Sequence, residues 1–187
     1  MTEILYKYRT TSNFKNFVDI ILNNRLYASK YDTLNDPMEG HYLYNDGVLD
    51  NRILDLIYSQ KQQLKVCALS KNPDNFLLWS HYADGHHGVA FGVRINDVNY
   101  SVNDIEYLSN LTIIDRYDAM TTKTILSKKL DLWSYEEEVR AFCETGNYIN
   151  VSIEKLIVGR KMGDQEYGFI RKLIDKINPT IEITRQI

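Results

Sequence analysis

Several features that would assign this chain to a common protein class are scarce or missing. Only two cysteines occur, Cys67 and Cys143, and no Cys-x-x-Cys pair is present, which argues against a disulfide framework and a structural zinc site. No run approaches the roughly 20 apolar residues of a membrane span, and residues 1–9 lack the apolar core of a signal peptide. We therefore expect a cytoplasmic protein with reduced, buried thiols and no membrane partner.

Charge and motif content argue against further classes. The net charge is only −3, which gives no general electrostatic attraction to nucleic acid or anionic lipid. A glycine-rich phosphate loop, a Gly-x-Ser-x-Gly elbow and a His-Glu-x-x-His motif are all absent, so the common dinucleotide, hydrolase and zincin sites are unsupported. His81, His86 and His87 lack an acidic partner at helical spacing, and we expect no metal site.

The spacing of apolar residues predicts one α+β domain over residues 1–187. Strands and helices do not alternate strictly, which disfavours a regular parallel sheet and favours a mostly antiparallel, split or mixed sheet flanked by helices. The expected strands cover residues 4–9, 25–29, 65–70, 88–94, 111–117, 137–143, 148–152, 155–159 and 180–185. The expected helices cover residues 14–22, 49–64, 73–82, 119–130 and 164–177, with Ser12, Asn72 and Asp164 as N-caps. Tyrosine is frequent, with 14 residues, and we expect it on half-buried sheet faces and cleft walls.

An acidic and aromatic segment, Trp133 to Arg140, is the first candidate site. On a strand, Glu136, Glu138 and Arg140 would share one face because they lie two residues apart. Two neighbouring carboxylates repel unless a cation or a raised pKa relieves them, and Arg140 offers that relief. A solvated edge strand with an ion pair is the structural alternative. Trp133 and Tyr135 favour a pocket, since aromatic walls beside acids are typical of one.

Two further groups could contribute to a site. On a helix, Trp79, Tyr82 and His86 would share a face within one to two turns, beside His81. Lys7 and Arg9 project from one face of the first expected strand. They are either surface side chains that cover apolar groups or a clamp for a phosphate or pyrophosphate.

Taken in order, these segments resemble the bacterial domain-of-unknown-function family 2971. The matching blocks are Leu5-Tyr-Lys-Tyr-Arg9, Arg25-Leu-Tyr-Ala-Ser29 with Leu34-Asn-Asp-Pro37, Cys67-Ala-Leu-Ser70, Leu78-Trp-Ser-His-Tyr-Ala83 with His86-His-Gly88, and Trp133-Ser-Tyr-Glu-Glu-Glu-Val-Arg140. They run from Leu5 to about Gly159. The resemblance implies a set of positions and no established activity: Asn35, Asp36, Pro37, Trp79, His81, Tyr82, His86, Gly88, Trp133, Tyr135, Glu136, Glu138 and Arg140.

The expected order of elements is also similar to that of compact ADP-ribosyltransferases. That resemblance implies that NAD is the substrate, that Lys7 or Arg9 holds its ribose or pyrophosphate, and that Tyr27 or Ser29 orders the nicotinamide side. Glu138, with Glu136 as the alternate, would stabilise the positive charge that develops when the glycosidic bond breaks. The chain departs from the pattern in lacking a clear early histidine and in carrying the block from Trp79 to Gly88.

Three functions therefore stay open. The first is an NAD-using ADP-ribosyltransferase or NAD-cleaving enzyme of the kind that acts in phage–host conflict or as a toxin. The second is a non-catalytic module that binds a nucleotide or a protein partner against a wall formed by Trp79, Tyr82 and Trp133. The third is a nucleic-acid processing enzyme with His81 and the acidic residues around a metal, which the mild net charge disfavours.

Overall fold

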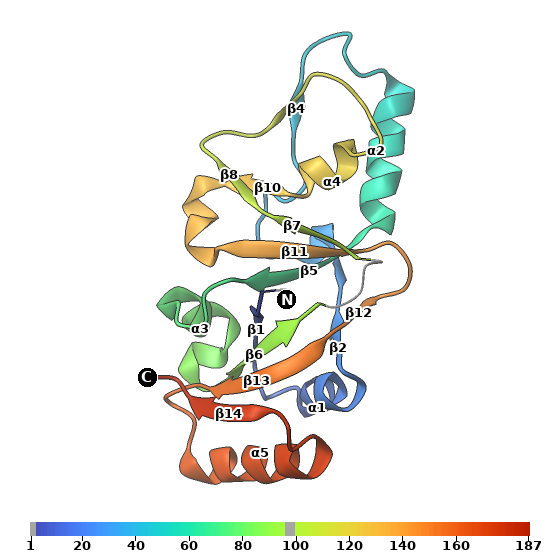
Figure 1. Cartoon of the computed structure of the whole chain (residues 1–187). Coiled ribbons are helices and arrows are strands. Elements are labelled where there is room, and N and C mark those ends of the chain that lie inside the picture. Colours follow the sequence, from blue (N-terminus) through green and yellow to red (C-terminus); the bar gives the residue numbers. More distant parts are fainter. Residues whose placement is uncertain (1–2, 96–99) are drawn as a thin grey trace.

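The computed structural model describes residues 3–95 and 100–187, and it confirms the expected α+β class (Figure 1). The α-helices are α1 (Phe14–Asn23), α2 (Asn51–Gln63), α3 (Phe76–Tyr82), α4 (Thr121–Ile125) and α5 (Asp164–Ile177), and the 3-10 helices are η1 (Tyr31–Thr33), η2 (Asp84–His86) and η3 (Asp131–Glu136). The strands are β1 (Leu5–Arg9), β2 (Arg25–Tyr27), β3 (Ser29–Lys30), β4 (Leu43–Tyr44), β5 (Lys65–Ser70), β6 (Val89–Arg94), β7 (Ser101–Asp104), β8 (Glu106–Leu108), β9 (Ile113–Ile114), β10 (Lys128–Leu130), β11 (Glu138–Cys143), β12 (Tyr148–Asn150), β13 (Ser152–Val158) and β14 (Glu182–Arg185).

The main sheet is mixed and almost wholly antiparallel, as expected. Its strand order is β14-β13-β6-β1-β5-β11-β7, and β3 also pairs with β5. Among the paired strands of this sheet, only β13 and β14 run parallel. Smaller two-stranded sheets join β12 to β2, β10 to β8 and β4 to β9.

The sheet is split between β1 and β5. These strands pair only at Tyr6 and Ser70, and further along β5 it is β3 that pairs with Lys65 and Val66. The stretch of β5 between these pairings therefore faces a gap. The Lys7 ammonium crosses the gap and donates to the Ala68 carbonyl oxygen at 2.5 Å, which gives that backbone acceptor a partner.

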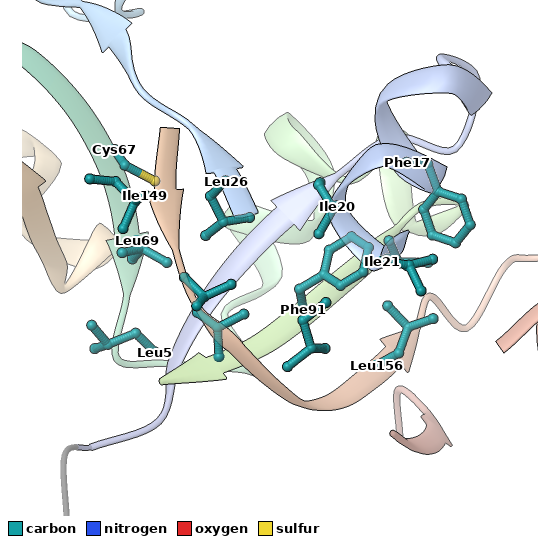
Figure 2. Packing of buried hydrophobic residues seen from close by; sticks show 14 of the residues in the cluster. Leu5, Phe17, Ile20, Ile21, Leu26, Cys67, Leu69, Phe91, Ile149 and Leu156 are labelled. Atoms are coloured by element: carbon teal, nitrogen blue, oxygen red, sulfur yellow. The ribbon is translucent and has the colours of Figure 1, made fainter. Parts of the chain in front are cut away.

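Apolar clusters cover the two faces of this sheet. The larger cluster packs α1 and α5 against one face and includes Leu5, Phe17 and Phe91 (Figure 2). A second cluster on the other face joins Tyr6 and Tyr8 to Trp79 of α3. Neighbouring residues of β1 thus serve opposite faces, as the period of a strand requires.

The helices are distributed over both ends of the sheet in Figure 1. α1 and α5 lie at the end that carries β13 and β14, whereas α2 and α4 lie beyond β7 and β11, and α3 lies beside β1. Among the described residues, no helix combines the length and the apolar character that crossing a membrane requires.

The expected helix over residues 119–130 is wrong in its second half. Helix α4 ends at Ile125, and Lys128 to Leu130 form β10, which pairs parallel with β8. The spacing of apolar residues in this segment is compatible with a helix and with a strand. Tertiary pairing decides between them, as it often does when intrinsic propensities are weak.

Other expected boundaries were also wrong. Asn75 caps α3 by accepting from the amides of Leu77 and Leu78, whereas Asn72 instead accepts from the Asp74 amide in the turn before it. Asn13 caps α1 in place of Ser12, and Gly163 precedes α5, so Asp164 is its first residue. The expected strand over 111–117 is too long, since only Ile113 and Ile114 form β9 there.

Candidate functional site

A cavity of about 230 Å³ lies at the split between β1 and β5. The residues that the sequence marked as candidate positions and that line it are Lys7, Arg9, Tyr27, Ser29, Asn35, Tyr82, Glu136, Glu138 and Arg140. Tyr6 and Tyr8 also line it, so tyrosines form part of the wall. Segments far apart in the chain therefore meet at this place.

Lys7 and Glu138 reach the cavity from opposite faces of the sheet. Lys7 pairs with Phe91 of the neighbouring strand β6, and Phe91 belongs to the cluster that packs against α1. Glu138 pairs with Ser70, which pairs with Tyr6 on the α3 face. In a continuous sheet these side chains would be separated by the backbone, and they share a cavity because the sheet is split.

Glu136 and Glu138 do not share a strand, contrary to expectation. Glu136 ends η3, and Glu137 takes the left-handed conformation with φ 44° before β11 begins at Glu138. The two carboxylates nevertheless converge, because the Lys129 ammonium lies 2.5 Å from an oxygen of Glu136 and 3.0 Å from one of Glu138. The Tyr82 hydroxyl donates to the other Glu136 oxygen at 2.7 Å.

The Arg140 guanidinium is held by other groups of the protein. Its Nε donates to Glu138 at 2.7 Å, and its two terminal nitrogens donate to both oxygens of Glu39 at 2.6 and 2.7 Å. Glu138 is 5% exposed and Arg140 1% exposed, and β11 lies between β5 and β7. The alternative of a solvated edge strand is therefore wrong, and Arg140 acts by positioning Glu138.

The network keeps Glu138 ionised. Burial alone would raise the pKa of Glu138, but the charges of Arg140 and Lys129 outweigh burial and hold the pKa below its usual value. Burial alone would likewise lower the pKa of Lys129, and the two carboxylates raise it instead. Burial and the hydrogen bond to Glu136 raise the pKa of Tyr82. At neutral pH Glu138 can therefore stabilise a nearby positive charge, but it has no proton to donate.

Lys7 and Arg9 differ from Lys129 and Arg140, because no carboxylate neutralises their positive charges. Among the described residues, neither cation has an acidic partner within 4 Å, and the Arg9 guanidinium makes no hydrogen bond. Burial lowers the pKa of Arg9. Burial, followed by repulsion from Arg9, lowers the pKa of Lys7 to about 8. Such a pair suits an anionic ligand.

Replacing Lys7 with Met should stabilise the protein at neutral pH. A pKa of about 8 in place of about 10.4 means that charging the folded amine costs about 3 kcal/mol. The variant also loses the hydrogen bond to the Ala68 carbonyl oxygen, which offsets about 1 kcal/mol of this gain. We therefore expect Lys7→Met to raise the free energy of unfolding by about 2 kcal/mol at pH 7.

The pH dependence tests the cause of this gain. Between pH 8 and about 10.4 the unfolded chain holds the Lys7 proton more often than the folded protein, so wild-type stability rises with pH in this window. The advantage of Lys7→Met should therefore be full below pH 8 and shrink above it in urea titrations. An advantage that does not change with pH would contradict this origin.

Trp79, His86 and His81 do not line the cavity. Trp79 is fully buried, donates from Nε1 to the Pro73 carbonyl oxygen and stacks on His86. His86 is held between Gln186 and Ser80, so it links α3 to the segment that follows β14. His81 is exposed on α3.

Trp133 and Tyr135 also lie outside the cavity lining. Their rings pack against each other on η3, and the Lys129 ammonium lies 4.7 Å from the centre of the Trp133 ring. The Trp133 ring therefore helps to hold the Lys129 ammonium through a cation–π contact. The expected aromatic wall of Trp79, Tyr82 and Trp133 is wrong, since only Tyr82 of these lines the cavity.

Sequence reasoning missed Lys129 and Glu39, which complete the network. Two carboxylates and one arginine leave a negative charge to be balanced, and that imbalance could have directed attention to the pair Lys128-Lys129. Glu39 carries no comparable signal, because it follows a turn and lies 101 residues from Arg140.

Gly88 contributes to the site through its backbone. A Cβ atom there would lie 2.3 Å from the Arg9 carbonyl oxygen, closer than real Cβ atoms approach an oxygen. Glycine is thus needed where β6 starts beside the end of β1, and this close approach helps to position Arg9.

Residues 3–95 and 100–187 contain no group of three or more His, Cys, Asp and Glu side chains arranged to hold a metal ion. Cys67 and Cys143 are free and buried, as expected. No protein-family model, curated protein or solved structure matches the chain. The resemblances to family 2971 and to ADP-ribosyltransferases therefore stay predictions.

Proposed function

We propose that the cavity binds NAD and that the chain is an ADP-ribosyltransferase-like enzyme, which breaks the bond between nicotinamide and ribose. The observation that carries this proposal is the meeting of two unneutralised cations, Lys7 and Arg9, with the ionised Glu138 in one cavity. An anionic group and a developing positive charge could be held there together.

The chemistry requires little from the protein beyond charge and position. When the glycosidic bond breaks, nicotinamide leaves with the bonding electron pair and positive charge develops on the ribose. An ionised Glu138 would stabilise that charge, and Arg9 with Lys7 would hold the pyrophosphate. Water or an acceptor group then attacks the ribose carbon, and the attacking group gives up a proton.

The size of the cavity limits how much of NAD it would enclose. At about 230 Å³ it is smaller than the roughly 300–1,000 Å³ of typical small-molecule sites. It would take a part of the dinucleotide, and the rest would extend past Tyr27, which is 50% exposed. Tyr27 and Ser29 stay the proposed contacts to the nicotinamide side.

A second candidate is a non-catalytic nucleotide-binding module. One observation favours it: both oxygens of Glu138 are already occupied, by Arg140 and Lys129. Carboxylates neutralised in this way contribute less to stabilising a new positive charge. The metal-dependent alternative has no such support, because His81 lies outside the cavity and the carboxylates hold Lys129.

The cell compartment and the biological role belong to the same proposal. Two free thiols buried in the core suit the reducing cytoplasm. A role in phage–host conflict or as a toxin would follow from depletion of NAD or modification of a host target.

The decisive experiment is to incubate the purified full chain with NAD and to measure released nicotinamide by chromatography. The proposal expects nicotinamide and ADP-ribose, or ADP-ribose attached to protein, at levels far above a protein-free control. Calorimetric binding of NAD with no release of nicotinamide would support the binding module instead. If the chain neither binds NAD nor releases nicotinamide, both candidate functions are overturned.

A further inference from the structure

Two lysines line the same cavity in opposite electrostatic situations. Lys129 lies between Glu136 and Glu138 and binds both. Lys7 has no carboxylate within ion-pair distance among the described residues, and its one hydrogen bond is to the Ala68 carbonyl oxygen. A neutral amine can also donate to a carbonyl oxygen, although more weakly than an ammonium, so this hydrogen bond does not require Lys7 to be charged.

The fold explains why Lys7 stays unneutralised. Lys7 starts on the α1 face of the sheet, opposite Phe91, and Arg9 follows two residues later on the same face. The charged and titratable groups that act on its amine are Arg9 from β1, Cys67 from β5, and Glu136 and Glu138 beyond the split. Both carboxylates are already held by Lys129 and Arg140. The surroundings of Lys7 thus make its uncharged form more accessible than that of an ordinary lysine.

We propose that the Lys7 amine is a nucleophile that forms a Schiff base with small carbonyl compounds carrying an anionic group. The amine nitrogen attacks the carbonyl carbon, a new carbon–nitrogen double bond forms, and the carbonyl oxygen leaves as water with both protons of the amine. The Arg9 guanidinium, which has no protein partner among the described residues, binds the carboxylate or phosphate of the same compound.

General chemistry supports this assignment of roles. Lysines become nucleophilic when burial and a neighbouring cation depress their charge, and the pKa of about 8 agrees with that environment. A cavity of about 230 Å³ accommodates a compound of a few heavy atoms, such as a 2-oxo acid. The proposal does not depend on NAD turnover, so each can fail without the other.

Reductive trapping tests the proposal. The purified full chain is treated at pH 7 with glyoxylate and cyanoborohydride, whose hydride reduces the imine to a stable carboxymethyl amine, and the modified lysines are mapped by peptide mass spectrometry. At pH 7 an amine with a pKa of about 8 is neutral in about one molecule in ten, whereas an ordinary lysine is neutral in about one in 2,500. Even with the lower nucleophilicity of a weaker base, we expect Lys7 to react at least about tenfold faster than any other lysine.

Lys129 is the internal control, since it lines the same cavity and is held by two carboxylates. It should stay unmodified while Lys7 reacts, and the Lys7 rate should reach half its maximum near pH 8. Modification of Lys7 no faster than exposed lysines, or no modification at all, would overturn the proposal.

The Arg9→Gln variant tests anion binding separately. Removing Arg9 also removes the repulsion that helps to lower the pKa of Lys7, so trapping of the neutral aldehyde propanal at Lys7 should slow somewhat. Trapping of glyoxylate should slow about tenfold more than trapping of propanal, because the anion loses its binding partner. Equal slowing with both aldehydes would remove Arg9 as the anion-binding group. Circular dichroism of Arg9→Gln and of Lys7→Arg, which should lose the specific adduct, checks that the fold is retained.

Discussion

Replacing Glu138 with Gln should reduce nicotinamide release from NAD by at least about 100-fold, the usual effect of removing a fixed group that stabilises charge in a transition state. The substitution keeps the shape of the side chain and removes its negative charge. Glu138 is the natural target because it is ionised, buried and part of the cavity wall.

Glu137→Gln provides a matched control. Glu137 is the preceding residue, is exposed and accepts a hydrogen bond from the Asn72 side chain at 2.8 Å outside the cavity lining. The same chemical change there should leave turnover within about twofold. Unaltered turnover in folded Glu138→Gln would show that Glu138 is not the stabilising group. Glu136→Gln would then test the alternate carboxylate.

Binding separates the two proposed functions. If Glu138 acts only on the transition state, Glu138→Gln should lose turnover while its affinity for NAD changes little. A binding module would show no turnover in the wild type and unchanged affinity in Glu138→Gln. Calorimetry on both proteins distinguishes these outcomes.

Replacing Arg140 with Met should lower the free energy of unfolding by about 3–5 kcal/mol, which is the usual cost of removing one partner from a buried ion pair. Arg140 is 1% exposed and binds Glu39, Glu138 and the Leu126 carbonyl oxygen. Its loss leaves two buried carboxylates without their main cation. Urea denaturation followed by fluorescence measures the change.

Arg185→Met is the matched control for Arg140→Met. Arg185 pairs with Asp164, whose side chain is 99% exposed, and such surface pairs contribute less than about 1 kcal/mol. A triple variant that adds Glu39→Gln and Glu138→Gln to Arg140→Met should recover part of the lost stability. Equal losses in Arg140→Met and Arg185→Met would contradict the proposed role of the buried network.

The network also predicts the response to acid. Because the folded pKa of Glu138 lies below its unfolded value, its contribution to stability is present above about pH 4 and is lost as the pH falls through the folded pKa. Arg140→Met should reduce this acid sensitivity, since it removes the main charge that lowers the pKa of Glu138.

Local regularities allowed much of the fold to be predicted from the sequence. The bounds of β5 agree with those expected from its apolar run, and α2 and α5 end within one residue of expectation. Their signals are short-range: apolar spacing, and Asn178-Pro179 after α5. The shared face of Glu138 and Arg140 was also correct, because two residues of one strand are related by geometry alone.

The candidate site depends on relations that no local pattern contains. The sequence by itself determined that Lys7 and Arg9 lie on one face of a strand and that Glu138 and Arg140 lie on one face of another. Only the tertiary structure decided that these faces meet, because the sheet splits where β3 takes over the pairing of β5. It also decided the partners, since Lys129 and Glu39 come from other segments. The buried charges of Glu138 and Arg140 need counter-charges, and the fold supplies these in space without regard to sequence order.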